Sequence, residues 1–230
     1  MDGSCSAQGT KGRAWLPQGQ TVKVLIIGAT GGTGRQLVEQ ALTAGHDVTA
    51  LVRDLEKIRA RHERLRVVQG DILDFNSLDL AVADQEAILS SLGTKSVFRP
   101  VIIFSEGTTN LLKAMTQHDV RRLICITGIG AGDSRGHGGF FYDKIILPIF
   151  LKRIYQDKDK QEEIIRKSDR DWTIVRPGFL TNGPPKGNYR VLTDLTRVTV
   201  GRISRADVAA FMLAQLNSDR YLRQTPLLTY

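Results

Sequence analysis

The sequence predicts an α/β protein with a doubly wound parallel sheet, helices on both faces and a small insertion near the C-terminus. Short β-branched runs alternate with helical periodicity in units of about 25 residues, which is typical of βαβ units. A glycine-rich turn directly follows the first of these runs. The 230 residues, of which 41% are hydrophobic and 24% charged, suit one globular domain with a full core.

Six β-branched runs are expected to form the strands, at 22–27, 47–52, 66–69, 87–90, 123–126 and 172–175. Between them, apolar residues recur at helical spacing and predict helices at 32–44, 75–83, 104–117 and 156–168. Right-handed crossovers applied to this order give a doubly wound sheet, in which ligands bind beyond the carboxyl ends of the strands. We therefore expect the functional residues to follow directly after strands.

The segment 178–203 breaks this alternation. It contains the turn signal Asn-Gly-Pro-Pro at 182–185 together with two short strand-like pieces. Ser204 is then expected to cap a closing helix that ends near Leu216. We expect the insertion to cover the substrate side of the site.

Residues 1–20 are expected to be a flexible and dispensable leader ahead of a single domain over 21–230. They hold no apolar run long enough for the core of a signal peptide. Cys5 and Cys125 cannot form a disulfide framework, and no Cys/His cluster has zinc-ligand spacing. These features predict a reducing, cytoplasmic setting and no bound metal.

The charge balance indicates a preference for anions. The chain carries 32 basic and 24 acidic residues, a formal net charge of +8, and such a surface attracts nucleic acid, acidic lipid or a phosphorylated cofactor. Its basic clusters lack interleaved aromatic residues and match no nucleic-acid-binding module. We expect neither a nucleic-acid nor a membrane partner, and the sequence leaves the oligomeric state open.

The strongest functional signal is the glycine-rich turn after the first strand. It opens the first helix and contains Gly28, Thr30, Gly31, Gly32, Thr33 and Gly34. Glycines allow a tight turn and let backbone N–H groups approach a pyrophosphate, whose charge the helix N-terminus favours. Because strand, turn, helix and second strand follow in the required order, we expect a Rossmann-type NAD(P)-binding domain rather than an ordinary glycine-rich turn.

The end of the second strand indicates which dinucleotide binds. NAD binders place an acid there for the ribose 2′-hydroxyl, and NADP binders place a base for the 2′-phosphate. Arg53 stands at this position and Arg35 is able to add a second cation. Asp54 follows Arg53 and keeps NAD(H) possible, and Arg53 could also be a solvated strand-end charge. The sequence favours NADP(H).

Two further segments after strands are candidate cofactor contacts. Asp71 follows the third strand, where its carboxylate could accept from an adenine amino group or cap the next turn. Leu92, Gly93 and Thr94 follow the fourth strand and are expected where the ribose and nicotinamide half of the cofactor passes.

Together these motifs resemble the atypical short-chain dehydrogenase/reductase group, in particular its NAD(P)H-binding, NmrA-like and biliverdin reductase B (flavin reductase) members. The resemblance spans about 22–220 and implies a small-molecule substrate; such relatives include flavin and tetrapyrrole reductases, sugar-nucleotide enzymes and non-catalytic redox sensors. Its residues are Gly28-Ala29-Thr30-Gly31-x-Thr33-Gly34, Leu51-Val52-Arg53-Asp54, Gly70-Asp71, Leu92-Gly93-Thr94, Ser105-Glu106-Gly107-x-x-Asn110, Trp172-Thr173-Ile174-Val175-Arg176-Pro177-Gly178 and Ile203-Ser204-Arg205-Ala206-Asp207-Val208-Ala209.

The chain departs from the pattern of such reductases at the expected catalytic end. Thr127 stands where related reductases often carry a serine. A Tyr-x-x-x-Lys pair lets the lysine lower the pKa of the tyrosine, but Tyr155 and Lys158 are one residue closer together. They still share a helix face, so they are either a coupled catalytic pair or a packing tyrosine beside a solvated or ribose-contacting lysine. His137, in a glycine-rich loop, is either a substrate contact or solvated.

Three functions of different classes fit these observations. The first is an NADPH-dependent reductase of a planar conjugated acceptor such as a flavin or tetrapyrrole, with the proton supplied by solvent. The second is a non-catalytic NADP(H)-sensing, NmrA-like regulatory protein. The third, nucleic-acid binding through the basic surface, is the weakest, because the glycine-rich turn already accounts for an anion preference.

Overall fold

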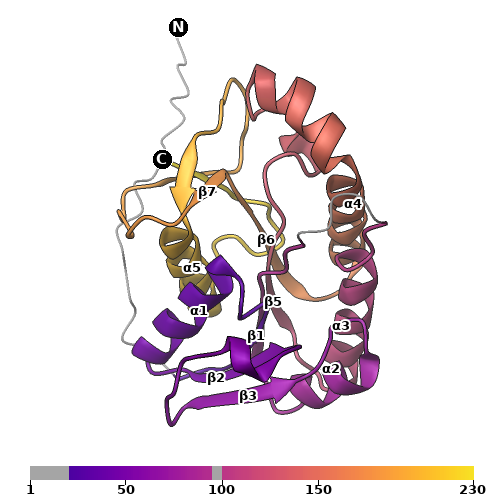
Figure 1. Cartoon of the computed structure of the whole chain (residues 1–230), viewed down its shortest axis with the longest axis vertical. Coiled ribbons are helices and arrows are strands. Elements are labelled where there is room, and N and C mark those ends of the chain that lie inside the picture. The colour runs from indigo at the N-terminus through magenta and orange to yellow at the C-terminus, as the bar shows by residue number, and fades with distance from the viewer. Residues whose placement is uncertain (1–20, 95–99) are drawn as a thin grey trace, which may run out of the picture.

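The computed structural model describes residues 21–94 and 100–230, so the leader expected at 1–20 lies outside the described residues. Within this described part, an eight-stranded sheet has the strand order β3-β2-β1-β4-β5-β6-β10-β8 (Figure 1). Its parallel strands include the six that the sequence predicts, which are β1 (Lys23–Ile27), β2 (Asp47–Val52), β3 (Leu65–Gln69), β4 (Ala87–Ser90), β5 (Arg122–Ile126) and β6 (Asp171–Pro177). The predicted doubly wound sheet is confirmed.

The strand order reverses at β1, which pairs with β2 on one side and with β4 on the other. The chain leaves the carboxyl ends of both β1 and β4 into loops at this point, and a crevice opens between the two loops. The fold therefore places the glycine-rich turn at the position where doubly wound sheets bind their ligands.

Helices cover both faces of the sheet. Val24 and Ile26 of β1 pack in one apolar core with helices α1 (Gly32–Thr43) and α5 (Arg205–Ala214). Leu25 and Ile27 point to the other face and pack beneath α2 (Phe75–Val82) and α3 (Ser105–Gln117). Figure 1 shows α4 (Lys152–Lys167) beside α3 on this second face. Short 3₁₀ turns lie at Leu55–Lys57, Gly132–Ser134 and Gln215–Asn217.

The sheet extends beyond β6 by two strands near the C-terminus. Strand β10 (Leu227–Thr229) pairs parallel to β6, and β8 (Arg190–Leu192) pairs antiparallel to β10. The predicted insertion holds β8 and also β7 (Phe179–Thr181), which pairs with β9 (Arg202–Ser204). Strand β10 has only three residues, too few for an alternating pattern to indicate it in the sequence.

The helix expected at 156–168 begins earlier than predicted. Helical structure starts at Phe140, continues as a π-helix over Tyr142–Leu151 and becomes α4 at Lys152. Pro148 lies inside the π-helix and has no N–H to donate. Because a proline and π-helical spacing both depart from the α-helical pattern, the sequence did not predict a helix over this segment. Among the described residues, no helix is both long and apolar enough to cross a membrane.

Candidate functional site

A cleft of ≈ 970 Å³ lies along the carboxyl ends of the parallel strands. It brings together residues from almost every segment singled out in the sequence. The predicted residues that line it are Gly28, Thr30, Gly31, Gly32, Thr33, Arg35, Arg53, Asp71, Leu92, Gly93, Thr94, Thr127, Tyr155 and Lys158. Gly34 lies behind this surface, where α1 meets the turn.

The glycine-rich turn forms a cradle that side chains would fill. Gly28 has a φ of +80°, and a Cβ atom on it would lie 2.6 Å from the carbonyl oxygen of Ser91. A Cβ atom on Gly34 would lie 2.0 Å from the carbonyl oxygen of Gly28. Gly31 precedes α1 and makes no side-chain cap, so the first backbone N–H groups of the helix are available to an anion. This geometry fits a pyrophosphate.

One end of the cleft is cationic. Arg35, Arg53 and Lys57 line it, and Arg205, which also lines the cleft, packs over Gly32 of the glycine-rich turn. Lys57 and Arg205 were not among the predicted site residues, although Arg205 directly follows the end of β9 and most of the predicted site residues also follow strand ends. Arg205 also donates to the Asn182 side chain at 2.7 Å, which connects the insertion to the glycine-rich turn.

Two acidic residues near this end accept hydrogen bonds from backbone N–H groups two residues further along the chain. Asp54 accepts from the backbone N–H of Glu56 at 3.1 Å and pairs with Lys57 at 2.9 Å, and the hydrogen bond from Lys57 lowers the pKa of its carboxyl. Asp71 accepts from the backbone N–H of Leu73 at 3.0 Å while it lines the cleft. Asp71 therefore caps the turn, as one of the two sequence-based interpretations expected, and still faces the cleft.

The other end of the cleft is built from α4 and the segments packed on it. The Tyr155 hydroxyl lies 3.0 Å from that of Tyr142, which lies 3.1 Å from the carbonyl oxygen of Ile129. Burial raises the pKa of Tyr155, so this phenol keeps its proton. Lys158 donates to the carbonyl oxygen of Thr127, and desolvation lowers the pKa of its ammonium group to about 8.

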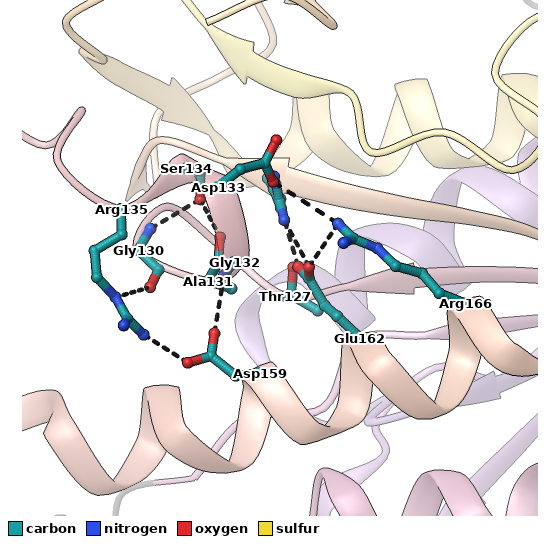
Figure 2. Close-up of polar contacts among 11 residues, drawn as sticks. Thr127, Gly130, Ala131, Gly132, Asp133, Ser134, Arg135, Asp159, Glu162 and Arg166 are labelled. Carbon is teal, nitrogen blue, oxygen red and sulfur yellow. Dashed lines mark hydrogen bonds and ion pairs between the residues drawn. The ribbon is translucent and has the colours of Figure 1, made fainter.

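The Thr127 hydroxyl belongs to a buried ionic network behind the cleft. It donates to Glu162 at 2.6 Å, and Glu162 binds the fully buried guanidinium of Arg176 through both oxygens, at 3.0 and 2.6 Å. Arg176 reaches Asp133 at 2.5 Å. Arg166 approaches Glu162 at 3.2 Å (Figure 2). This network holds the loop after β5 against α4, and nothing in the sequence pattern indicated it.

The insertion closes the same end. Phe179 and Leu180 line the cleft, and the rings of Tyr142 and Phe179 meet edge to face with centroids 5.0 Å apart. His137 hydrogen-bonds the carbonyl oxygen of Val198 at 2.8 Å. This hydrogen bond connects the glycine-rich loop that carries His137 to the insertion, and it helps to hold the insertion over the cleft.

Comparison with known proteins agrees with this geometry. Residues 28–219 match the model of a family described as NAD(P)H-binding. An uncharacterized chloroplastic protein of Arabidopsis thaliana is 32% identical over 215 residues, which cover 86% of this chain and 74% of that protein.

Solved structures with the same fold include two reductase-type proteins. ChuY, an anaerobillin reductase of Escherichia coli O157:H7, is 23% identical with a TM-score of 0.76, over 90% of this chain and 96% of ChuY. A short-chain dehydrogenase/reductase of Veillonella parvula, solved in complex with NADP, is 20% identical with a TM-score of 0.77, over 92% of this chain and 95% of that one. At these identities the likeness shows the fold.

Proposed function

The chain belongs to the NAD(P)H-binding family, and from this premise we propose that it is an NADPH-dependent reductase of a planar conjugated acceptor such as a tetrapyrrole or flavin. The observation that carries the proposal is the continuity of the cleft. It runs from a cationic end through the glycine-rich turn to an end lined by aromatic and aliphatic side chains. A dinucleotide laid along it would present its nicotinamide ring to the apolar end.

NADP(H) is the proposed cofactor because the cationic end suits a 2′-phosphate. Arg35, Arg53 and Lys57 all line this end. Asp54, the residue that kept NAD(H) possible, already accepts from Glu56 and Lys57. Its carboxylate is thus already engaged within the chain, whereas guanidinium groups bind phosphate by charge-assisted hydrogen bonds.

A planar apolar acceptor is proposed because of the side chains at the other end. Ile129, Tyr142, Phe179 and Leu180 offer flat or aliphatic surfaces against which a conjugated ring could stack. The description of ChuY as an anaerobillin reductase supports a tetrapyrrole within this class.

The chain's own groups are proposed to position the reactants rather than to supply the proton. When bound, NADPH supplies the hydride. Tyr155 and Lys158 would hold the nicotinamide ribose, and the Thr127 segment would support Lys158 through its carbonyl oxygen. The raised pKa of Tyr155 and the engagement of the Thr127 hydroxyl by Glu162 favour solvent as the proton source.

The experiment is NADPH oxidation with a panel of flavins, quinones, biliverdin and sugar nucleotides. Turnover with at least one ring acceptor and no turnover with sugar nucleotides is expected.

The alternative is an NADP(H)-sensing regulatory protein. It is favoured by the same two observations, the raised pKa of Tyr155 and the hydrogen bond from the Thr127 hydroxyl to Glu162. It would be supported if NADPH binds tightly and no acceptor is reduced. Salt-sensitive DNA binding that persists at saturating NADPH would instead favour the nucleic-acid hypothesis.

A cytoplasmic location is also part of the proposal. The proposal rests on the two cysteines of the sequence, which are too few for a disulfide framework and suit a reducing compartment. The Arabidopsis relative, in contrast, is described as chloroplastic. Imaging of the full chain carrying a C-terminal fluorescent tag tests it.

A further inference from the structure

Four large apolar side chains are exposed on the helical segment that precedes α4. The exposed fractions are 79% for Phe140, 64% for Phe141, 67% for Ile149 and 53% for Phe150. Exposed aromatic and aliphatic side chains that gather on one element mark interaction surfaces. In Figure 1 this helical segment forms one extreme of the molecule, opposite the end that carries α2.

The π-helical geometry brings these residues onto one face. A π-helix closes its hydrogen bonds between residues i and i+5, so it has more residues per turn than an α-helix, and residues nine apart return to nearly the same side. Phe140 and Phe141 lie just before the π-helix, and this geometry brings them close to the side that carries Ile149 and Phe150. In an ordinary α-helix the same spacing would place them on opposite sides. The residues Phe140, Phe141, Ile149 and Phe150 are called the exposed apolar face below.

The opposite side of the same segment belongs to the protein interior. Tyr142 and Leu147 are buried there, five residues apart, in the apolar cluster beneath the cleft. Tyr142 also lines the cleft. Whatever the exposed apolar face binds is therefore separated from the cleft by the thickness of one helix.

Cationic side chains surround the exposed apolar face. Lys144 lies one π-turn after Phe140, on the same face, and Lys152 and Arg153 are exposed at the start of α4. Asp143 is the acidic residue between Phe140 and Arg153, so this segment carries a net positive charge within a chain of net charge +8. A twofold contact between two copies would bring these like charges together.

We propose that the exposed apolar face docks onto the surface of a membrane that contains anionic lipids. Phenylalanine and isoleucine side chains enter the boundary between headgroups and acyl chains, while lysine ammonium groups meet lipid phosphates. Docking of this kind needs no spanning helix. It revises the expectation, drawn from the sequence, that the chain has no membrane partner. If the reductase proposal holds, the cleft would draw its acceptor from compounds dissolved in the bilayer.

The test is flotation of the full chain with lipid vesicles. Two vesicle types are used, phosphatidylcholine alone and phosphatidylcholine mixed with phosphatidylglycerol. We expect the chain to bind the mixed vesicles. Raised salt should weaken this binding by screening the charge attraction but should not abolish it, because salt does not screen the burial of apolar side chains. The double variant Phe141→Gln/Phe150→Gln should lower the partition coefficient by about tenfold or more. Lys144→Gln should lower it less and reduce the salt dependence.

The matched control is Leu80→Gln. Leu80 is 69% exposed and lies on α2, at the other end of the molecule. This variant should bind vesicles like the unchanged chain, and all variants should keep their NADPH affinity in lipid-free buffer. That measurement separates failure of membrane docking from failure of the proposed function.

Three results would overturn the proposal. The chain could fail to bind mixed vesicles. The double variant could bind as well as the unchanged chain and lose binding at raised salt, which would show non-specific adsorption of a basic protein. The unchanged chain could form a dimer without lipid that the double variant dissociates, which would assign the face to a second copy.

Discussion

Some polar side chains of the cleft already form hydrogen bonds or ion pairs with neighbouring residues, and others do so less. Arg53 lines the cationic end, while the neighbouring Asp54 accepts from a backbone N–H and from Lys57. At the other end, the Thr127 hydroxyl donates to Glu162. The Asp54 carboxylate and the Thr127 hydroxyl therefore help to hold the loops in place. In contrast, Arg53, Tyr155 and Lys158 line the cleft and are the candidates for ligand contacts.

Arg53→Ala should reduce the preference for NADPH over NADH. Removing a guanidinium that pairs with the 2′-phosphate should weaken NADPH binding by about tenfold or more and leave NADH binding almost unchanged. Calorimetric titration with both cofactors measures the ratio. Arg66→Ala removes an exposed arginine from neighbouring β3 and serves as the control. An unchanged ratio in Arg53→Ala would show that Arg53 is a solvated strand-end charge.

Tyr155→Phe should lower kcat by less than about tenfold, because solvent rather than the buried phenol supplies the proton. The substitution keeps the ring and its packing. Steady-state kinetics with the acceptor that gives turnover measures the effect. Tyr142→Phe removes the hydroxyl that bonds Tyr155 and is the matched comparison. A loss of about a hundredfold or more, with NADPH affinity unchanged, would establish Tyr155 as a general acid.

Lys158 predicts a pH dependence of cofactor binding near pH 8. Desolvation lowers the pKa of its ammonium group to about 8, so the group is charged below this pH and neutral above it. If the ammonium holds the nicotinamide ribose, NADPH affinity should fall as pH rises through about 8. Lys158→Met should bind weakly with no change across this range. The prediction fails if both proteins show the same pH profile.

At the scale of elements, two buried polar anchors position the parts that close the cleft. Glu162 and Arg176 join α4 to β6 behind the loop that follows β5. Asp207 in the first turn of α5 accepts from the backbone N–H groups of Lys186 and Gly187 and from the hydroxyl of Tyr230. This carboxylate therefore fixes the insertion and the C-terminal residue to the same helix.

Asp207→Asn should destabilise the fold by about 1–3 kcal/mol at neutral pH. Burial acts to raise the pKa of Asp207, but the hydrogen bonds from Lys186, Gly187, Tyr230 and Ser204 outweigh it and lower the pKa. The stabilisation is therefore complete above the ordinary carboxyl pKa and is lost as pH falls through the lower, folded-state value. Urea unfolding of both proteins at several pH values should show a difference that shrinks in acid. A difference independent of pH would contradict this account.

At the scale of the whole molecule, the cleft exists because the strand order reverses between β1 and β4. Loops from both halves of the sheet contribute to one ligand site there. Binding along this line contacts most of the parallel strands at their carboxyl ends. A ligand held there should stabilise the domain as one unit.

NADPH should raise the melting temperature of the chain, and NADH should raise it less. A ligand at about a hundredfold above its Kd adds about 2.7 kcal/mol, which corresponds to about 5–10 °C for a domain of this size. Differential scanning fluorimetry across a cofactor titration measures the shift. Equal shifts with the two cofactors would remove the proposed preference for NADP(H). No shift with either would argue against dinucleotide binding.

The sequence by itself determined the features that depend on neighbours along the chain. Alternating β-branched runs and helical periodicity predicted the six strands up to β6 and the main helices, because these patterns repeat within a few residues. The glycine-rich turn was predictable for the same reason, since strand, turn and helix are contiguous. The position of Arg53 at a strand end follows from that register.

Only the tertiary structure decided which polar side chains of the cleft bind other residues and which distant segments line the cleft. The partners of Thr127 are Glu162, 35 residues later, and Lys158, 31 residues later, and Arg205 packs over Gly32 from the far end of the chain. Strand β10 forms because β6 offers an edge to it. Contacts between residues distant in sequence are set by how the whole sheet packs, so no local pattern records them.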